Sequence, residues 1–202
     1  MRIIQPIARL KRQAEKQSDN LEGGRPWRTL DFLLYLLLVM LVVLAIRSVA
    51  IDPVRVDGSS MLDTLEENDI MFVDRVVYCF RMPKRGDIVI CYYPDAYYTQ
   101  TNKSYNTRVK RVAAVGGDTI EARDGVVYVN GTAIDEPYLT ASRIGFWEIE
   151  KQTVPDDCIY VLGDNRSVSI DSRNPNVGPI PLYRVVGKVR GVLYPFSRIG
   201  KP

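Results

Sequence analysis

An apolar run near the amino terminus places the strongest constraint on how this chain can fold. Every residue from Phe32 to Ile46 is apolar or Tyr, and the run reaches about 17 residues when it is extended to Leu30 across Asp31. A helix needs about 20 apolar residues, with a lower limit near 17, to cross the hydrocarbon core of a bilayer. We therefore expect a single transmembrane helix over residues 29–50.

The charges around this run predict its orientation. Residues 1–28 carry seven Lys or Arg side chains against three Asp or Glu, whereas residues 29–202 sum to −1 within a total of +3. Because positive flanks stay on the cytoplasmic side, we expect a cytoplasmic tail over 1–28, a plasma-membrane anchor and an extracytoplasmic domain over 51–202. The near-neutral domain argues against a nucleic-acid partner, which needs a concentrated basic surface. A cleaved signal peptide is the alternative to an anchor, but its basic region is normally much shorter.

The residues that usually bind zinc are scarce. The chain has no histidine, and its three cysteines, Cys79, Cys91 and Cys158, lack the spacing of a zinc site. Outside the cytoplasm one pair could form a disulfide, and the alternative is three small buried hydrophobes. We expect no metal and no other cofactor.

After the apolar run the sequence becomes typical of β-structure. Short stretches rich in Val, Ile and Tyr recur between Gly, Pro, Asp and Asn. They are I-M-F-V-D-R-V-V (70–77), D-I-V-I-C-Y-Y (87–93), T-R-V-K-R-V-A-A-V (107–115), G-V-V-Y-V (125–129), C-I-Y-V-L (158–162) and V-V-G-K-V-R-G-V-L (185–193). No long amphipathic helix is predicted beyond Ile51, so we expect a mainly β body of antiparallel sheets.

Turn signals subdivide this body. Asp124-Gly125 and Asn130-Gly131 predict two tight hairpins. They fall in the segment 122–157, which we expect to form a small β cap inserted into the larger body. The polar stretch 93–107 predicts a long exposed loop.

Two adjacent serines follow a glycine in the stretch G-S-S-M. A serine nucleophile needs a base, and without histidine that base must be a carboxylate or a lysine whose pKa is lowered by burial. Lys110 lies in an apolar strand, where alternation would place Val112 and Ala114 on its face and leave Arg111 solvated on the other. Both patterns have simpler explanations, since G-S-S can be a plain turn and Lys-Arg can protect a strand edge from aggregation.

A polar loop follows the apolar strand that ends near Leu162. The segment 160–174 reads Y-V-L-G-D-N-R-S-V-S-I-D-S-R-N. Such a loop can place a hydroxyl against a lysine and hold it there with an internal Asp–Arg pair. A turn stabilised by local side-chain bonds is the alternative.

Four segments taken together resemble the successive sequence boxes of type I signal peptidases, in their small, Gram-positive-like form. They are G-S-S-M-L-D-T-L, R-G-D-I-V-I-C-Y-Y-P, K-R-V-A-A-V-G-G-D and G-D-N-R-S-V-S-I-D-S-R, which occur in that order and span most of residues 52–192. The resemblance implies an antiparallel catalytic body with a β cap behind one membrane anchor. It also implies a serine endopeptidase that removes signal peptides from secreted preproteins at Ala-x-Ala-like sites.

The resemblance assigns roles to individual residues. Ser60, the serine before methionine, corresponds to the nucleophile, and Lys110 corresponds to the base. Ser169 matches the serine that hydrogen bonds this lysine, and Gly58 stands where some relatives have a serine that helps the Ser60 backbone N–H to bind the oxyanion. Asp171 and Arg173 match the pair of family residues that shapes the loop. Asp164 and Arg166 match the family residues in the first half of that loop.

The substrate is expected to lie beside Ser60. Small side chains at a cleavage site need shallow apolar pockets, and by position Met61, Ile88 and Val112 could line them. The expected partners are signal peptides of preproteins and membrane lipid, and we expect the protein to act as a monomer.

Two departures from the family pattern bear on activity. Asp63 replaces the usual proline, and a nearby carboxylate would raise the pKa of Lys110 and oppose its action as a base. Ala114 stands where glycine is common. Two alternatives follow: a self-cleaving Ser/Lys protease of the SOS-repressor type, which would need an amino-terminal DNA-binding domain, and an inactive relative that serves as a membrane-tethered binding factor.

Overall fold

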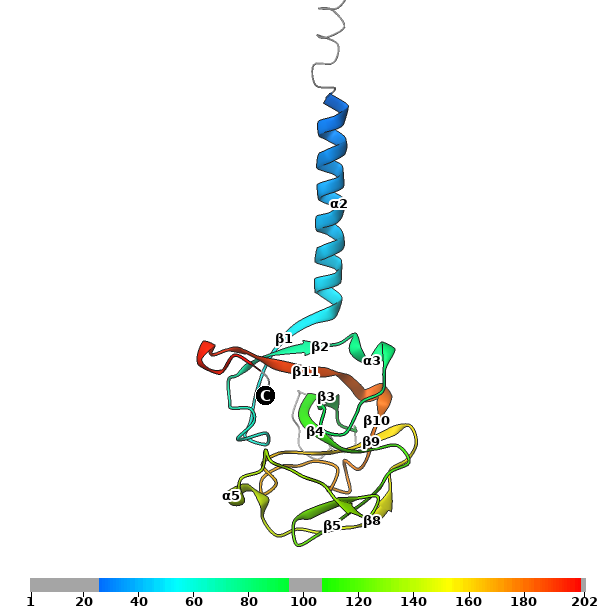
Figure 1. Ribbon diagram of the computed structural model, residues 1–202, viewed down its shortest axis with the longest axis vertical. Helices are drawn as coiled ribbons and strands as arrows, with labels where there is room; N and C mark the ends of the chain where they lie inside the picture. The colour runs from blue at the N-terminus through cyan, green and yellow to red at the C-terminus, as the bar shows by residue number, and fades with distance from the viewer. Residues whose placement is uncertain (1–25, 95–106, 201–202) are drawn as a thin grey trace, which may run out of the picture. The chain divides into compact units, whose positions relative to one another are not determined.

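The computed structural model describes residues 26–94 and 107–200, so the predicted tail over 1–28 lies almost wholly outside the described residues. The chain divides into two units, Met1–Ser48 and Val49–Pro202. Most of helix α2 (Pro26–Ala50) belongs to the first unit (Figure 1). Pro26 suits the first helical position, where its missing N–H is not needed, and the Leu-rich sequence that follows favours a helix. Within the described residues, no helix meets both the length and the apolarity needed to span a membrane.

A seven-stranded antiparallel sheet forms the larger part of the second unit, with the strand order β1-β2-β11-β3-β4-β9-β10 (Figure 1). Its strands are β1 (Ile51–Arg55), β2 (Ile70–Asp74), β3 (Ile88–Tyr92), β4 (Thr107–Val115), β9 (Cys158–Leu162), β10 (Ile180–Pro181) and β11 (Val185–Tyr194). The central strands β3 and β9 are almost continuously buried, which explains their unbroken runs of Val, Ile and Leu.

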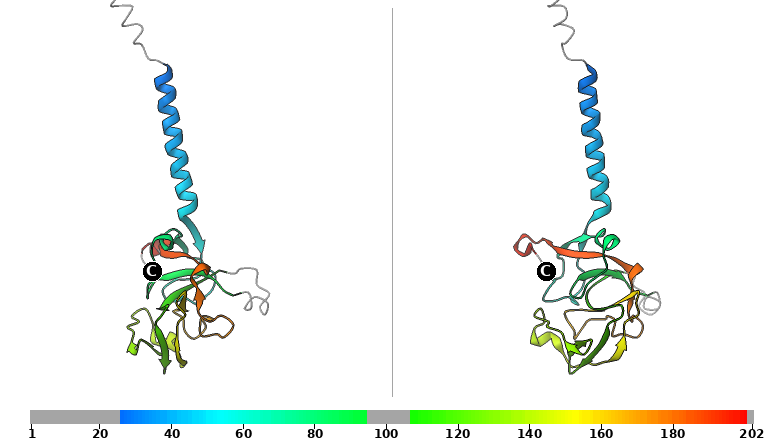
Figure 2. Two further views of the ribbon diagram at one scale, coloured as in Figure 1. Left: turned by 90° about the vertical axis from the view of Figure 1, so that its right-hand side faces the viewer. Right: turned by 45° about the vertical axis from the view of Figure 1, so that its right-hand side comes forward.

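A smaller antiparallel sheet has the order β7-β6-β5-β8. Its strands are β5 (Thr119–Arg123), β6 (Val126–Val129), β7 (Thr132–Ala133) and β8 (Ile149–Thr153). The two predicted hairpin turns are confirmed, because Asp124, Gly125, Asn130 and Gly131 all have positive φ between β5 and β6 and between β6 and β7. In Figure 2 the small sheet lies at one end of the second unit and β11 at the other.

Helices play a minor part in the second unit. Those in its described residues are α3 (Val77–Phe80), α5 (Ala141–Ile144) and the 3₁₀ turns η1 (Leu182–Arg184) and η2 (Phe196–Arg198). The mainly β body predicted from the sequence is therefore confirmed. The small sheet begins at Thr119, three residues before the segment 122–157 that we expected to form a cap.

Strand β4 contains a bulge that the alternation pattern missed. The register with β9 shifts between Val112 and Ala114, so Ala113 is the extra residue. Ala113 and Ala114 then both pack into a core cluster with Ile120 and other residues of the small sheet. The prediction that Ala114 alternates with Ala113 and shares a face with Lys110 is wrong for this reason.

The cysteines and Tyr93 also differ from expectation. The three cysteines are free thiols, and only Cys91 is buried, whereas Cys79 is exposed. Residues 95–106 of the predicted exposed loop lie outside the described residues. Tyr93, at its start, is 1% exposed and donates a hydrogen bond from its hydroxyl to the Ile170 carbonyl over 2.7 Å. Its phenol ring therefore belongs to the core.

Candidate active site

Ser60 and Lys110 come from segments 50 residues apart and meet at one point. Ser60 lies in the turn that follows β1, and Lys110 lies in β4 opposite Val89 of β3. Lys110 Nζ and Ser60 Oγ are 2.6 Å apart in a hydrogen bond, and Nζ also donates to the Val109 carbonyl over 3.0 Å. A hydroxyl within hydrogen-bond distance of an amine is the geometry that a Ser/Lys nucleophile and base require.

The surroundings of Lys110 favour its neutral form. Its side chain is 1% exposed, and burial lowers its pKa from 10.5 to about 8. The Asp171 carboxylate, Cys91 and Asp164 act in the opposite direction, while Arg108 lowers the pKa further. Since burial outweighs the carboxylates, a substantial fraction of the lysine is neutral near pH 8 and can accept a proton.

The loop after β9 supports the backbone around Ser60. The Asn165 backbone N–H donates to the Ser60 carbonyl over 3.0 Å, and its side-chain amide donates to the Ser59 carbonyl over 3.0 Å. Gly163 allows this close approach, because a Cβ there would lie 2.6 Å from the Ser60 carbonyl oxygen and 2.2 Å from Ser169 Oγ. The backbone at Ser59 and Ser60 is therefore held by contacts that no larger residue at position 163 would permit.

Ser169 lies in the same loop but does not hydrogen bond Lys110 in this structure. Its Oγ is buried and lacks a hydrogen-bond partner among the described residues. The hydroxyl nevertheless lies close to the Ser60 backbone, because both are in close contact with Gly163. An unpaired buried hydroxyl beside a nucleophile is a ready donor or acceptor for a group that enters the site.

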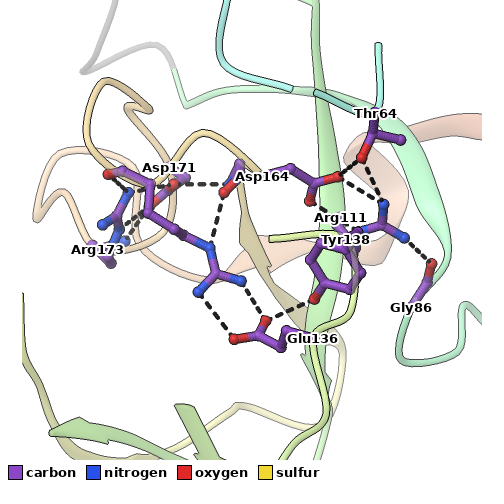
Figure 3. Close-up of polar contacts among 10 residues, drawn as sticks. Thr64, Gly86, Arg111, Glu136, Tyr138, Asp164, Asp171 and Arg173 are labelled. Carbon is purple, nitrogen blue, oxygen red and sulfur yellow. Dashed lines mark hydrogen bonds and ion pairs between the residues drawn. The ribbon is translucent and has the colours of Figure 1, made fainter. Parts of the chain in front are cut away.

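The expected pair between Asp171 and Arg173 forms within the loop (Figure 3). Arg173 Nε and Nη2 bind the two carboxylate oxygens of Asp171 over 2.7 and 2.9 Å. Asp171 also accepts the Gly163 backbone N–H over 3.0 Å. This two-pronged pair fixes the loop against the end of β9.

The side chains of Asp164 and Arg166 do not pair with each other. The Asp164 carboxylate binds Arg111 Nε and Nη2 over 2.9 and 2.7 Å and accepts the Thr64 hydroxyl over 2.5 Å (Figure 3). The Arg111 side chain is only 11% exposed, and its guanidinium lies 3.8 Å from the centre of the Tyr138 ring. The prediction that Arg111 stays solvated is wrong, because a buried carboxylate and an aromatic ring replace water around it.

A cavity of about 500 Å³ opens beside Ser60. Its lining is mainly apolar and comes from β1, the turn that holds Ser60, and the neighbouring parts of β3 and β4: Val54, Arg55, Val56, Asp57, Gly58, Ser60, Met61, Ile90, Thr107, Arg108 and Val109. Of the three residues expected to line a substrate pocket, Met61 lines this cavity, whereas Ile88 and Val112 are not among its lining residues. The cavity lies where Ile90 pairs with Val109, and Ile88 pairs with Arg111 farther along the two strands.

Comparison with known proteins shows the family to which this chain belongs. The family model described as "Signal peptidase, peptidase S26" matches residues 29–194. The chain belongs to the signal peptidase S26 family.

Individual relatives are similar over most of their length. "Signal peptidase I S" of Bacillus subtilis is 36% identical over 81% of this chain and 89% of its own. "Signal peptidase I" of Leptolyngbya laminosa is 34% identical over 81% of this chain and 79% of its own. A crystal structure of a signal peptidase I from Enterococcus faecalis is 28% identical, covers 54% of this chain and 97% of its own, and has a TM-score of 0.41.

Family membership makes this chain a serine peptidase. The family's usual proline position holds Asp63, which is exposed and accepts the Thr140 hydroxyl over 3.0 Å. The charged groups that act on Lys110 most strongly are those named above, and Asp63 is not among them. Within the described residues, no group of three His, Cys, Asp or Glu side chains could hold a metal ion.

Sequence reasoning missed three contributors to this signal peptidase site. The alternation pattern places Arg111 in solvent, and nothing in the sequence points to Glu136 or Tyr138. Glu136 forms an ion pair with Arg166, and Tyr138 packs on Arg111. Glu136 is 30 residues from its partner, so only the folded topology brings the two together. The sequence indicates only an internal Asp–Arg pair within the loop.

Proposed function

We propose that this protein is a membrane-anchored serine endopeptidase that removes amino-terminal signal peptides from secreted preproteins at Ala-x-Ala-like sites. The observation that carries the proposal is the 2.6 Å contact between Ser60 Oγ and the buried Lys110 Nζ. In this mechanism neutral Lys110 takes the proton from Ser60 as its oxygen attacks the scissile carbonyl. The resulting ammonium then gives the proton to the departing amine, which leaves an acyl-enzyme on Ser60.

The second half of the reaction uses the same two residues. Lys110, neutral again, activates a water molecule that hydrolyses the ester on Ser60 and releases the signal peptide. The Ser60 backbone N–H is the candidate donor to the oxyanion of both tetrahedral intermediates, and loss of one such donor typically costs about 3 kcal/mol of transition-state stabilisation. Gly58 has no side chain to add, so a second donor would come from backbone or water.

The cavity beside Ser60 supports small apolar residues as the preferred side chains at the cleavage site. Val54, Val56, Met61, Ile90 and Val109 supply aliphatic surface around the nucleophile. A small apolar side chain gains free energy from burial there, whereas a charged one would lose its hydration.

The composition of α2 supports a membrane anchor. Its apolar side chains from Phe32 to Leu44 are all 40% or more exposed, and a helix that is apolar on every side needs an apolar environment. The basic residues before it support a cytoplasmic amino terminus and an extracytoplasmic catalytic domain in the plasma membrane. Lipid would then be a partner alongside the preprotein, and no second copy of the chain is required for the dyad.

Cleavage of a model preprotein with an Ala-x-Ala site, in detergent or lipid across pH 6 to 10, tests the proposal. We expect wild type to cut after the second alanine, Ser60→Ala and Lys110→Ala to abolish cleavage, and Ser59→Ala to retain it. A folded wild-type protein that cuts nothing at any pH would contradict the proposal and favour a non-catalytic binding role.

A further inference from the structure

One carboxylate from the small-sheet half of the domain reaches the loop that supports the nucleophile. Glu136, in the segment between β7 and α5, binds both terminal nitrogens of Arg166: Nη1 lies 3.2 Å from Oε2, and Nη2 contacts Oε1. The two side chains are 9% and 1% exposed. Arg166 Nε also donates to the Gly163 carbonyl over 2.9 Å, so the ion pair is attached directly to the backbone beside Ser60.

Tyr138 connects the same carboxylate to the strand that carries the base. Its hydroxyl donates to Glu136 Oε1 over 2.7 Å (Figure 3). Its ring packs on the guanidinium of Arg111 at 3.8 Å, one residue after Lys110. Glu136 therefore contacts Arg166 of the supporting loop and also Tyr138, which stacks on Arg111 of β4.

Two further residues, Trp147 and Thr140, join this segment to the catalytic loops. The Trp147 ring lies 5.2 Å from the Arg166 guanidinium and 4.6 Å from that of Arg173. Thr140 donates to the Asp63 carboxylate, three residues after the nucleophile. The segment 136–147 therefore contacts the Ser60 turn, the Lys110 strand and the supporting loop, although it supplies no group to the dyad itself.

We propose that Glu136 is a positioning residue for the Ser60–Lys110 dyad, a role that rests on the proposed function. Glu136 fixes Arg166, Arg166 fixes the backbone at Gly163, and the adjoining Asn165 holds the Ser60 carbonyl. A nucleophile that is misplaced by about 1 Å can lose about 100-fold in rate even when the mutation is remote. Because Glu136 does not line the substrate cavity, its effect belongs in kcat and not in KM.

Steady-state cleavage of the model preprotein by Glu136→Gln, Glu136→Asp and Glu121→Gln tests this role. Glu136→Gln removes the charge but keeps the shape, and we expect kcat to fall by roughly ten- to 100-fold with KM changed by less than about twofold. Glu136→Asp restores the charge and should recover most of the loss. Glu121 is the matched control, because it lies on the small sheet and pairs with the exposed Arg123. Glu121→Gln should match wild type.

Hydrogen exchange at the Asn165 amide gives a readout that does not depend on activity. We expect faster exchange there in Glu136→Gln and unchanged exchange in Glu121→Gln, since only the first change releases the loop that bonds Ser60. Tyr138→Phe serves if Glu136→Gln does not fold, and it should produce a smaller fall in kcat and a smaller rise in exchange.

The outcomes separate this inference from the proposed function. An active Glu136→Gln enzyme with wild-type kcat, or one whose only defect is a lower Tm or a higher KM, overturns the positioning role. If wild type and Glu121→Gln both fail to cleave the preprotein, the proposed function fails, and the Asn165 exchange rates still decide whether Glu136 holds the loop.

Discussion

The two sides of strand β4 have opposite effects on two neighbouring basic residues. Lys110 and Arg111 follow one another, and their side chains are 1% and 11% exposed. Lys110 hydrogen bonds a hydroxyl and a backbone carbonyl, and burial lowers its pKa to about 8. Arg111 instead meets the Asp164 carboxylate through two hydrogen bonds.

The two environments suit different roles, since one favours proton transfer by Lys110 and the other favours a permanent ion pair of Arg111. A lysine held without a direct carboxylate partner can lose its proton near neutral pH, so it can act as a base. An arginine keeps its charge under all such conditions and binds a carboxylate through a planar fork, so it can join loops permanently. One strand thus presents a removable proton on one side and a fixed charge on the other.

Replacement of Lys110 by Arg and of Arg111 by Lys provides the most severe test of this contrast. Lys110→Arg places a permanently charged side chain at the base position, and we expect kcat to fall by at least about 10⁴-fold. Arg111→Lys keeps the charge but loses the two-pronged bond, and we expect it to retain kcat within about tenfold. Preprotein cleavage by both variants provides the measurement, with circular dichroism to establish that each is folded. An active Lys110→Arg enzyme would show that Lys110 is not the base.

Removal of the partner of Arg111 should mainly affect stability. Asp164→Asn leaves a buried guanidinium without its counter-charge, which typically destabilises a fold by about 3–5 kcal/mol. Urea unfolding measures this change. Asp74→Asn is the control, because its partner Arg190 is 42% exposed and such surface pairs contribute about 0–1 kcal/mol. Equal losses in the two variants would contradict the buried character of the Arg111 pair.

Replacement of Lys110 by an apolar side chain should increase the free energy of unfolding, whereas Asp164→Asn should decrease it. Because the folded pKa of about 8 lies below the ordinary 10.5, the folded protein is destabilised by the charged lysine below pH 8, and this penalty disappears as pH rises to 10.5. A shift of this size corresponds to about 3 kcal/mol. We therefore expect Lys110→Met to be more stable than wild type at pH 7, by up to about 3 kcal/mol.

The dependence on pH distinguishes this effect from a simple gain in packing. The difference in unfolding free energy between Lys110→Met and wild type should narrow steadily as pH rises from 7.5 to 10. Urea unfolding at several pH values gives the curve. A difference that stays constant over this range would mean that the lysine does not titrate with a lowered pKa.

Local sequence patterns predict the individual strands and turns of this fold better than they predict the contacts between distant segments. The turn residues Asn130 and Gly131 adopt positive φ as the sequence indicated, because their chemistry acts within a few residues. The sequence also indicates Ser60 and Lys110 as the candidate nucleophile and base, since the lack of histidine narrows the choice of base and the motif order resembles a known family. Their contact across 50 residues is the part that the structure supplies.

The features that escaped prediction depend on distant partners or on one inserted residue. The bulge at Ala113 leaves no mark in an apolar strand, yet it changes which face Ala114 occupies. Arg111 looks like an ordinary surface cation until Asp164, 53 residues away, is placed beside it. The cavity lies at Ile90 and not at Ile88, because the position along paired strands is set by tertiary packing.

Asp63 provides the finest test of the contrast between the two sides of β4. Its carboxylate is exposed and bonded to Thr140, whereas the carboxylates that raise the pKa of Lys110 belong to Asp171 and Asp164. Water and salt screen an exposed charge much more strongly than a buried one. We therefore expect Asp63→Asn to move the acidic limb of the pH–kcat profile, centred near pH 8, by less than about 0.3 pH units. The same profile for Thr140→Val serves as the control, because it removes the bond to Asp63 but keeps the charge. A fall of a full unit in Asp63→Asn alone would place Asp63 among the charges that govern the base, and the replacement of proline at this position would then be a direct adjustment of catalysis.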